Sequence, residues 1–531
     1  MKMVKSLLLG SAAGLVAVAG AQAADLPVKA KPVEYVKVCS IYGAGFFYIP
    51  GTDTCIKIGG WVRAEMDFNA GASHTHFYSG AGGRNNRIDT DDTTMRSRFV
   101  ISNDIRTQTE YGTLRAYSRA GFDIATRELN GGRFYIERSF IQFAGFTVGR
   151  TQSYFDFYAG AHQYTGYIGG PTSTGATGTV VFAYTATFGN GFTATLAVED
   201  PSQRRNAIWD AGTDALTIGG FPGPTTYAPG GPLGGGFAGA NAVGDYGASQ
   251  VPDIVGSLRV DQAWGSAQIA AALHQVRAGY FGNNTTPGGV GSAAYTGVAP
   301  SDKWGFAVMA GIVLNLPWAK GDQFWVEGAY TVGAPGYTSL SAGAVGDYNT
   351  WQRFNGGNVA AAWALDAIFG NVGTAAAPSG SLELTTVWTI GASLQHYWTP
   401  ALRSSIFGAY TSVDFNGAAT AMFCSGGNTP VRTVGGLTPA QAGIAFNNVA
   451  GLAGCNPDFN IWGVGSRTIW NPVPNLDIGV EVVYANIQTK FDSGTTRLNF
   501  GGSGGRAAGL YTPSSENVWS GILRVQRNFW P

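Results

Sequence analysis

A two-residue alternation of apolar and polar side chains constrains this chain more than any other feature. Between residues 60 and 68 every second side chain is apolar, and the side chains between them are mostly charged. The same alternation returns at residues 258–261, 477–484 and 519–529. Because successive side chains of a strand point to opposite faces, each segment forms a strand with one apolar and one polar face. The sequence therefore predicts an all-β protein.

The connections between these segments fall into two length classes. Seven are short, at residues 107–112, 145, 189–191, 265–266, 317–321, 398–400 and 471–475. Eight are long and rich in glycine, at about residues 69–92, 121–132, 152–178, 200–250, 282–301, 336–380, 416–459 and 492–515. Short and long connections alternate strictly, which predicts sixteen strands with all short turns at one end and all long loops at the other. This is the arrangement of a bacterial outer-membrane barrel, whereas a soluble sandwich has no reason to sort its loops by end.

The composition supports strands that cross a membrane. Charged residues make up 12% of the chain, against roughly 25% in soluble domains. No apolar run after residue 23 reaches the ~18 residues of a transmembrane helix, whereas segments of roughly ten to sixteen residues cross the hydrocarbon layer as tilted strands. Aromatic residues near the strand ends suit interfacial girdles: Tyr111, Phe188, Phe192, Trp264, Trp304, Trp398 and Trp470. We predict a 16-stranded antiparallel transmembrane β-barrel in contact with outer-membrane lipid.

The first 23 residues have the pattern of a secretory signal peptide. A basic start precedes an apolar run, and the small residues at 21–23 are typical of a cleavage site. We expect the mature chain to begin at Ala24, with an N-terminal periplasmic strap over residues 24–54 and the barrel over residues 55–531. Without the signal, acidic residues slightly outnumber basic ones. That balance argues against nucleic acid as a partner.

Four cysteines occur in this exported chain: Cys39, Cys55, Cys424 and Cys455. Disulfides persist outside the cytoplasm, and four cysteines allow three pairings. The nearest-neighbour pairing, Cys39 with Cys55 and Cys424 with Cys455, closes the shortest loops and is the one we favour. Free or zinc-bound cysteines remain an alternative, although no C-x-x-C spacing is present.

Three stretches resemble the alphaproteobacterial porins, the rhizobial and Brucella-type general porin family. They are Tyr48–Arg63, Arg138–Ser153 and Arg524–Phe529. The resemblance spans the mature chain and is weakest in the long loops. It implies a homotrimer of sixteen-stranded barrels in the outer membrane, with the third long loop, residues 152–178, folded into the lumen.

Charged side chains on the polar faces of the early strands are the candidates for lining such a lumen. An arginine at the lipid midplane costs roughly 2–4 kcal/mol, so these faces must point inward. The third long loop offers a single acid, Asp156, opposite them. Arginines facing a carboxylate set up a transverse field that separates the paths of anions and cations. The predicted constriction residues are Asp156, Arg63, Arg96, Arg98, Arg115, Arg119, Arg138 and Arg150. The alternative interpretation is that these arginines only neutralise acids on a solvated face.

Other chemistry has little support in the sequence. The motifs G-x-x-x-x-G-K-[ST], H-E-x-x-H and G-x-S-x-G are absent, so we expect no enzyme activity. His74 and His76 lie near three aspartates, but a solvated polar patch in the first long loop explains them better than a metal site, and we expect neither metal nor cofactor.

Three functions fit these observations. The first is a water-filled channel for passive diffusion of small hydrophilic solutes and ions across the outer membrane. The second is a solute-selective channel, in which aromatic residues of the third long loop form a stacking track for sugars: Tyr154, Tyr158, Tyr164 and Tyr167. The third is a secreted, soluble, β-rich adhesin. The sequence favours the first.

Overall fold

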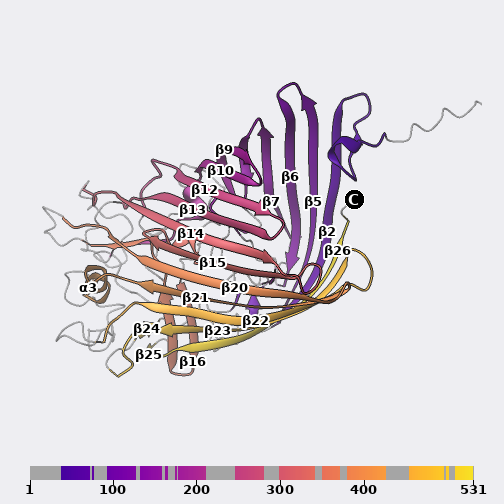
Figure 1. The fold of residues 1–531 in the computed structure, drawn as a ribbon. Coiled ribbons are helices and arrows are strands. Elements are labelled where there is room, and N and C mark those ends of the chain that lie inside the picture. The colour runs from indigo at the N-terminus through magenta and orange to yellow at the C-terminus, as the bar shows by residue number, and fades with distance from the viewer. Residues whose placement is uncertain are drawn as a thin grey trace, which may run out of the picture.

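The computed structural model describes most of the chain (Figure 1). The described residues are 37–71, 75–76, 93–126, 132–157, 162–164, 174–175, 178–210, 246–279, 298–340, 350–370, 379–425, 454–494, 498–500 and 509–529. The expected signal peptide, the Gly/Ala-rich stretch 212–245 and the side chains of His74, His76, Tyr158 and Tyr167 lie outside them. Among the described residues, no helix is long and apolar enough to cross a membrane, a finding that has no bearing on spans made of strands.

Sixteen strands close into one antiparallel barrel, as the sequence predicts. They are β2 (Thr54–Phe68), β5 (Thr93–Thr109), β6 (Gly112–Ala125), β7 (Arg133–Phe143), β8 (Phe146–Thr151), β9 (Thr179–Gly189), β10 (Phe192–Glu199), β12 (Asp253–Gln262), β13 (Gly265–Val276), β14 (Lys303–Asn315), β15 (Gln323–Val332), β20 (Thr386–Thr399), β21 (Leu402–Asp414), β22 (Phe459–Trp470), β23 (Leu476–Thr489) and β26 (Glu516–Asn528). Each strand pairs with the next along the chain, and β26 returns to pair with β2 from Trp61↔Asn528 to Phe68↔Gly521. Closure leaves no unpaired edge in the barrel.

The order of short turns and long loops is confirmed with one exception. Short turns follow β5, β7, β9, β12, β14, β20 and β22, and long connections follow β2, β8, β10, β13, β15, β21 and β23. The connection after β6, residues 126–132, was predicted to be long but has the same length as the turn after β14, residues 316–322. At the turn after β9, Asn190 and Gly191 have φ angles of 49° and 76°, and a Cβ on Gly191 would lie 1.9 Å from the carbonyl oxygen of Asp261. Only glycine fits there. Strand length was predicted less well, since β8 has 6 residues, β10 has 8 and β5 has 17.

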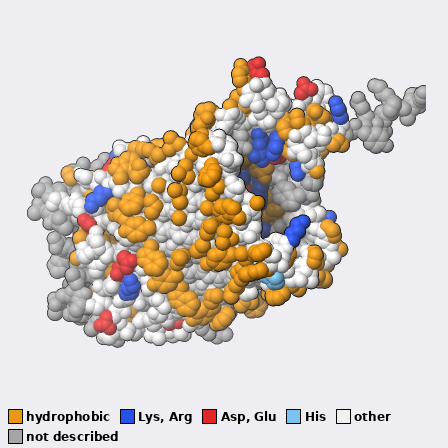
Figure 2. Space-filling view, in the orientation of Figure 1, with side chains coloured by type: hydrophobic (Ala, Val, Ile, Leu, Met, Phe, Trp, Pro, Cys, Tyr) orange, Lys and Arg blue, Asp and Glu red, His pale blue; other side chains and the backbone are white. Residues whose placement is uncertain are grey.

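The two faces of the barrel differ as the alternation predicts. Val62 and Phe68 of β2 are exposed on the outer face, whereas Glu65 and Asp67 between them are buried on the inner face. All seven aromatic residues predicted for the girdles are exposed. Figure 2 shows a broad hydrophobic surface over the strands, with few charged side chains. An apolar outer face on a closed barrel suits lipid and is unlike the surface of a soluble adhesin.

The long connections carry structure of their own. Their elements are η1 (Ser40–Tyr42), β1 (Phe47–Tyr48), β3 (Ala70–Gly71), β4 (Thr75–His76), η2 (Pro201–Gln203), β11 (Ile208–Asp210), η3 (Pro335–Tyr337), β16 (Thr350–Asn355), β17 (Asn358–Trp363), β18 (Ala367–Phe369), β19 (Glu383–Leu384), α3 (Gly417–Ser425), β24 (Leu498–Phe500) and β25 (Gly509–Pro513). Strands β11, β18 and β19 form one small sheet, and β16, β17, β25 and β24 form another. These connections are therefore more than irregular loops.

The predicted disulfide at the start of the chain is present. Cys39 is bonded to Cys55, the second residue of β2, and both are buried beside Phe46. Strand β1 pairs with β2 through Phe47↔Ile56 and Tyr48↔Cys55. Cys455 is also disulfide-bonded, while the side chain of Cys424 lies outside the described residues, so that pairing stays a prediction.

Candidate functional site

Eight arginines gather on the inner face of four neighbouring strands, β2, β5, β6 and β7. We call this group the arginine wall: Arg63, Arg96, Arg98, Arg106, Arg115, Arg119, Arg133 and Arg138. The strand register places several of them side by side, with Arg63 opposite Arg98, Arg106 opposite Arg115, and Arg119 opposite Arg138. In Figure 2, basic side chains gather in a hollow of the molecule on the side where these strands run. Six of the predicted constriction residues thus lie together.

Buried carboxylates hold these like charges next to one another. Glu65 accepts hydrogen bonds from Arg96 at 2.7 and 2.9 Å and lies 2.6 Å from Nε of Arg524. Asp104 accepts from both Arg106 and Arg115 at 2.8–2.9 Å. Opposite charges directly adjacent across strands offset the repulsion between paired arginines.

A β-bulge in β7 adds a further pair to the wall. The register between β6 and β7 shifts after Arg119↔Arg138, and Ala120 then pairs with Ile136, so Glu137 is the extra residue. Glu137 is buried 2.5 Å from Nε of Arg119, while Arg138 donates a hydrogen bond to the carbonyl oxygen of Gly175. A bulge places two successive side chains where strict alternation allows one. Arg138 therefore also contacts the third long loop.

Arg150 stands apart from this group. Its cross-strand neighbours are Ser139 of β7 and Val180 of β9, and Val180 is exposed on the outer face. Residues that pair directly across two strands lie on the same face of the sheet, so Arg150 shares the outer face with Val180. Thr147 and its partner Gln142 lie on the opposite, inner face, which carries the arginine wall. The structure does not bring Arg150 into the arginine wall.

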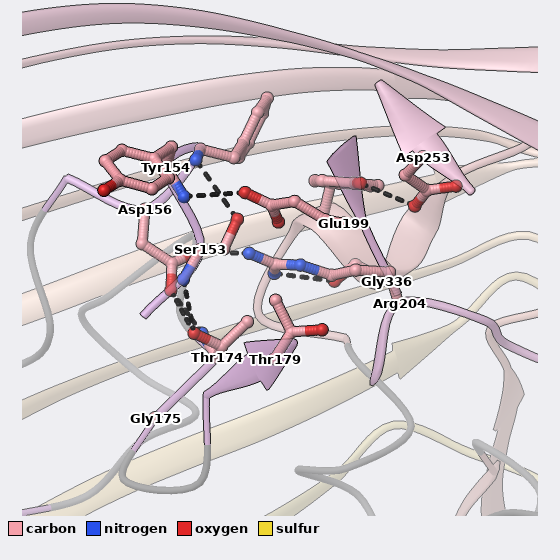
Figure 3. A network of polar contacts seen from close by, with 12 residues as sticks. Ser153, Tyr154, Asp156, Thr174, Gly175, Thr179, Glu199, Arg204, Asp253 and Gly336 are labelled. Atoms are coloured by element: carbon pink, nitrogen blue, oxygen red, sulfur yellow. Dashed lines mark hydrogen bonds and ion pairs between the residues drawn. The ribbon is translucent and has the colours of Figure 1, made fainter. Parts of the chain in front are cut away.

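The beginning of the third long loop is fastened to the inner face of the barrel (Figure 3). Asp156 is buried and forms an ion pair with Arg204, and its other oxygen accepts hydrogen bonds from the backbone and hydroxyl of Thr174. The backbone N–H of Tyr154 donates to Glu199 at 2.9 Å. Asp156 therefore faces a buried partner instead of open water. Its contacts join the start of the loop to Arg204 and to Thr174.

The aromatic residues of this segment pack on small inward-facing side chains. Phe155 and Phe157 join a buried cluster whose barrel members come from β9 to β15: Val181, Ala183, Ala197, Val255, Ala270, Ala272, Ala307, Met309, Val313, Trp325 and Ala329. Arg204 donates a hydrogen bond to the carbonyl oxygen of Gly336 at 3.1 Å. The network thus joins the third, fourth and sixth long connections on one side of the barrel.

The middle of the same loop contacts the opposite strands. Nδ1 of His162 lies 2.6 Å from Oγ of Ser393 in β20, and the hydroxyl of Ser405 in β21 donates to the His162 carbonyl oxygen at 2.5 Å. The backbone N–H of Tyr164 donates to Glu481 of β23 at 2.5 Å. Described parts of this loop therefore contact inward-facing residues from β10 round to β23.

Two arginines lie close to the ring of Tyr164. The guanidinium carbon of Arg524 lies 3.6 Å from the centre of its ring, and that of Arg467 lies 5.0 Å away. A Cβ on Gly479 would come within 2.1 Å of the Tyr164 hydroxyl, so glycine at that position makes room for the ring. Of the predicted stacking track, Tyr154 is packed against the cluster around Phe155, and Tyr158 and Tyr167 lie outside the described residues.

A second apolar cluster lies inside the barrel, in the half nearer the long connections. Buried residues from the long connections pack there: Ala207, Trp209, Leu340, Phe354, Val359, Ala360, Ala361, Ala362, Trp363, Ala364, Leu365, Ile368, Phe415, Ala419, Phe423, Cys455, Phe491, Leu498 and Tyr511. Their barrel partners are inward-facing residues of β20 to β26: Val387, Phe407, Val413, Phe459, Ile461, Val483, Ala485, Ile487 and Val518. We call this the inner apolar cluster. It reaches Phe407, near the middle of β21.

Neither this cluster nor the two arginines beside Tyr164 is among the residues predicted from the sequence. The apolar stretch 358–369 falls within the predicted sixth long loop, although its run of valine, alanines, tryptophan and leucine is too apolar for an exposed connection. Apolar residues on the inward faces of β22 and β23 were a second available signal, because a purely water-lined wall would be polar there. Within the described residues, no group of three or more His, Cys, Asp or Glu side chains is arranged to hold a metal ion.

Comparison with known proteins agrees with this architecture. A family model described as "Porin subfamily" matches residues 25–522. The chain is 31% identical over 350 residues to Porin Omp2b of Brucella suis, an alignment that covers 62% of this chain and 75% of that protein. It is also 31% identical over 354 residues to Porin Omp2b of Brucella melitensis, with the same coverage.

A likeness to a solved structure supports the fold. The outer membrane channel DcaP of Acinetobacter baumannii superposes with a TM-score of 0.51 at 14% identity, over 91% of this chain and 99% of that one. At this identity the likeness concerns the fold alone. The match to the family model over nearly the whole chain, the Brucella relatives and the closed sixteen-stranded barrel together show that this chain belongs to the porin family and is an outer-membrane channel protein.

Proposed function

We propose that this porin is a passive channel for small hydrophilic solutes and ions, narrowed by its third long loop. The observation that carries the proposal is the placement of that loop: it contacts the inner faces of β10 and β13 at one end and those of β20, β21 and β23 further along. A segment that reaches from one wall to the other reduces the open cross-section. A barrel of sixteen strands is otherwise wide enough for an aqueous channel.

In this proposal the constriction lies between the loop and the arginine wall. The loop supplies mainly bulk, since its acid Asp156 is neutralised by Arg204. The wall supplies the charge, through Arg63, Arg96, Arg98, Arg115, Arg119 and Arg138. Charged groups that line a narrow aqueous path determine which solutes pass.

The functional unit in this proposal is a homotrimer in outer-membrane lipid. The chain reaches that membrane after cleavage of the signal peptide at residues 1–23, and residues 24–54 form a strap at the periplasmic end, held to the barrel by the Cys39–Cys55 bond. No cofactor takes part.

Single-channel recording in planar bilayers tests the proposal. Purified, heat-modifiable protein should give discrete steps whose conductance rises in proportion to salt concentration and does not saturate with added sugars. A folded protein that inserts and yields no steps would contradict the channel proposal. Steps that neutral sugars block in a saturable way would instead indicate the solute-selective alternative.

A further inference from the structure

We infer that the channel of this porin is more permeable to small anions than to small cations. This inference rests on the proposed function and adds the substrate class: small inorganic and organic anions such as chloride, phosphate and short carboxylates. The preference depends on which charged groups of the described lumen remain in contact with water. The total charge of the chain does not decide the preference. The chain as a whole has equal numbers of basic and acidic residues.

In three pairs of the arginine wall, the arginine is more exposed than its acidic partner. The side chain of Arg98 is 16% exposed and its partner Asp123 is 1% exposed. Arg119 is 30% exposed and its partner Glu137 is 1% exposed. Arg115 is 27% exposed, against 13% for Asp104, which it shares with Arg106. In each pair the acid is less exposed than the arginine, so a passing solute meets more of the positive group.

The facing walls offer few accessible acids to cancel this charge. Asp156 is covered by its ion pair with Arg204, and Glu199 is buried behind the backbone of Tyr154. On the far side, Glu481 is buried under the backbone of Tyr164. These three acids, which lie beside the third long loop, are thus shielded from the water of the channel.

The inner apolar cluster removes a further part of the lumen from the path. It covers the inward faces of β20 to β26 in the half of the barrel nearer the long connections. The side chains there are almost fully buried, so they exclude water and ions. The third long loop covers the small side chains of β9 to β15. The inner surface that neither of them covers includes the faces of β2, β5, β6 and β7, which carry the arginine wall.

A positive wall beside a narrow water path favours anions for a physical reason. Low-dielectric walls concentrate the field of exposed charges, which raises the local concentration of the opposite ion and lowers that of the like ion. The buried carboxylates weaken this field without reversing it, because they lie deeper than the guanidinium groups. The preference should be moderate, since each arginine keeps an acid partner.

Reversal potentials across bilayers in a potassium chloride gradient test the inference. We expect a chloride-to-potassium permeability ratio above one, which shrinks when the mean salt concentration rises, since the Debye length falls from ~10 Å at 0.1 M to ~3 Å at 1 M. A triple variant, Arg98→Gln with Arg115→Gln and Arg119→Gln, should lower the ratio by about twofold or more. The matching triple Arg→Lys variant should keep it above one.

A control and the contrary outcomes complete the experiment. Arg527→Gln removes a basic side chain near the end of β26, where Arg527 pairs across strands with Val62 on the outer face, and should leave the ratio nearly unchanged. Clear channel steps with a ratio of one or less would overturn the anion preference and leave the channel proposal standing. Folded protein without steps would overturn both. Equal ratios for the Gln and Lys variants would assign any preference to groups other than the arginine wall.

Discussion

The ring of Tyr164 lies directly under the guanidinium of Arg524, 3.6 Å from the ring centre, although one residue belongs to the third long loop and the other to the last strand. Arg524 also pairs with Glu65 of the first barrel strand at 2.6 Å. The loop is thus attached where the barrel closes. A cation over an aromatic face contributes about 0.5–2 kcal/mol, so this contact is a substantial part of the attachment.

We predict that releasing Tyr164 widens the channel. Tyr164→Ala should raise the single-channel conductance and add open-state noise, because the loop loses its contact with Arg524. Gly479→Ala should act in the same way, since the added methyl group would lie 2.1 Å from the Tyr164 hydroxyl. Tyr164→Phe removes that hydroxyl and should partly rescue Gly479→Ala in the double variant. Independent, additive effects of the two substitutions would contradict the proposed contact.

A second prediction concerns the buried pair of Asp156 and Arg204. Removing one partner leaves an uncompensated buried charge, at a cost of about 3–5 kcal/mol. Asp156→Asn or Arg204→Gln should therefore increase hydrogen exchange of residues 153–157 while the barrel remains heat-modifiable. The apolar double variant Asp156→Leu with Arg204→Met should recover much of the protection. Unchanged exchange in both single variants would show that the pair does not anchor the loop.

A third prediction is a pH dependence of the loop attachment. Burial lowers the pKa of His162 from 6.5 to about 4, so the attached loop binds a proton less readily than the released loop. The contribution of His162 to the free energy of loop attachment is fully present above pH 6.5 and is lost as the pH falls toward 4. It amounts to about 1.4 kcal/mol for each unit of pKa difference. Channel noise should rise over that interval. His162→Gln should remove this part of the response, and an identical pH profile for the variant would exclude His162 as its source.

A fourth prediction concerns the hairpin of β16 and β17 within the inner apolar cluster. Ala361 is fully buried there, so Ala361→Arg places an unpaired charge among apolar side chains and should expel the hairpin. The measurable result is a higher conductance in a barrel that still folds. Gly357→Glu adds a charge at the turn of the same hairpin, where a Cβ meets nothing within 4 Å, and should change little. Equal conductance for both variants would mean that the hairpin does not obstruct the path.

A fifth prediction concerns the Cys39–Cys55 disulfide. The two cysteines are 16 residues apart, and a bond that closes a loop of this size contributes about 3 kcal/mol. Reduction, or Cys39→Ser with Cys55→Ser, should expose the segment before Thr54 to protease while β2 and the rest of the barrel stay protected. Mass spectrometry of the fragments provides the readout. Protection of the segment after reduction would show that pairing of β1 with β2 alone holds it.

The division between local and long-range information accounts for what could be predicted from the sequence. The alternation places Arg98 and Phe99 on opposite faces of the strand, and the cost of a charge in lipid turns Arg98 inward. Turn chemistry is local too, as at Asn190 and Gly191. The strand number and the apolar outer face follow from such short-range patterns, and both are confirmed. The alternation of short and long connections holds except after β6.

The contacts inside the barrel depend on closure, which no short-range pattern encodes. Some contacts join segments that become neighbours only when the sheet curves round and β26 meets β2. Examples are the ion pair of Asp156 with Arg204 and the contacts of Arg467 and Arg524 with the ring of Tyr164. By itself the sequence determined the barrel and its apolar outer face, since the alternation that produces them is set residue by residue. Only the tertiary structure decided which charges are buried and which face water, because burial depends on what the closed barrel and its loops bring together.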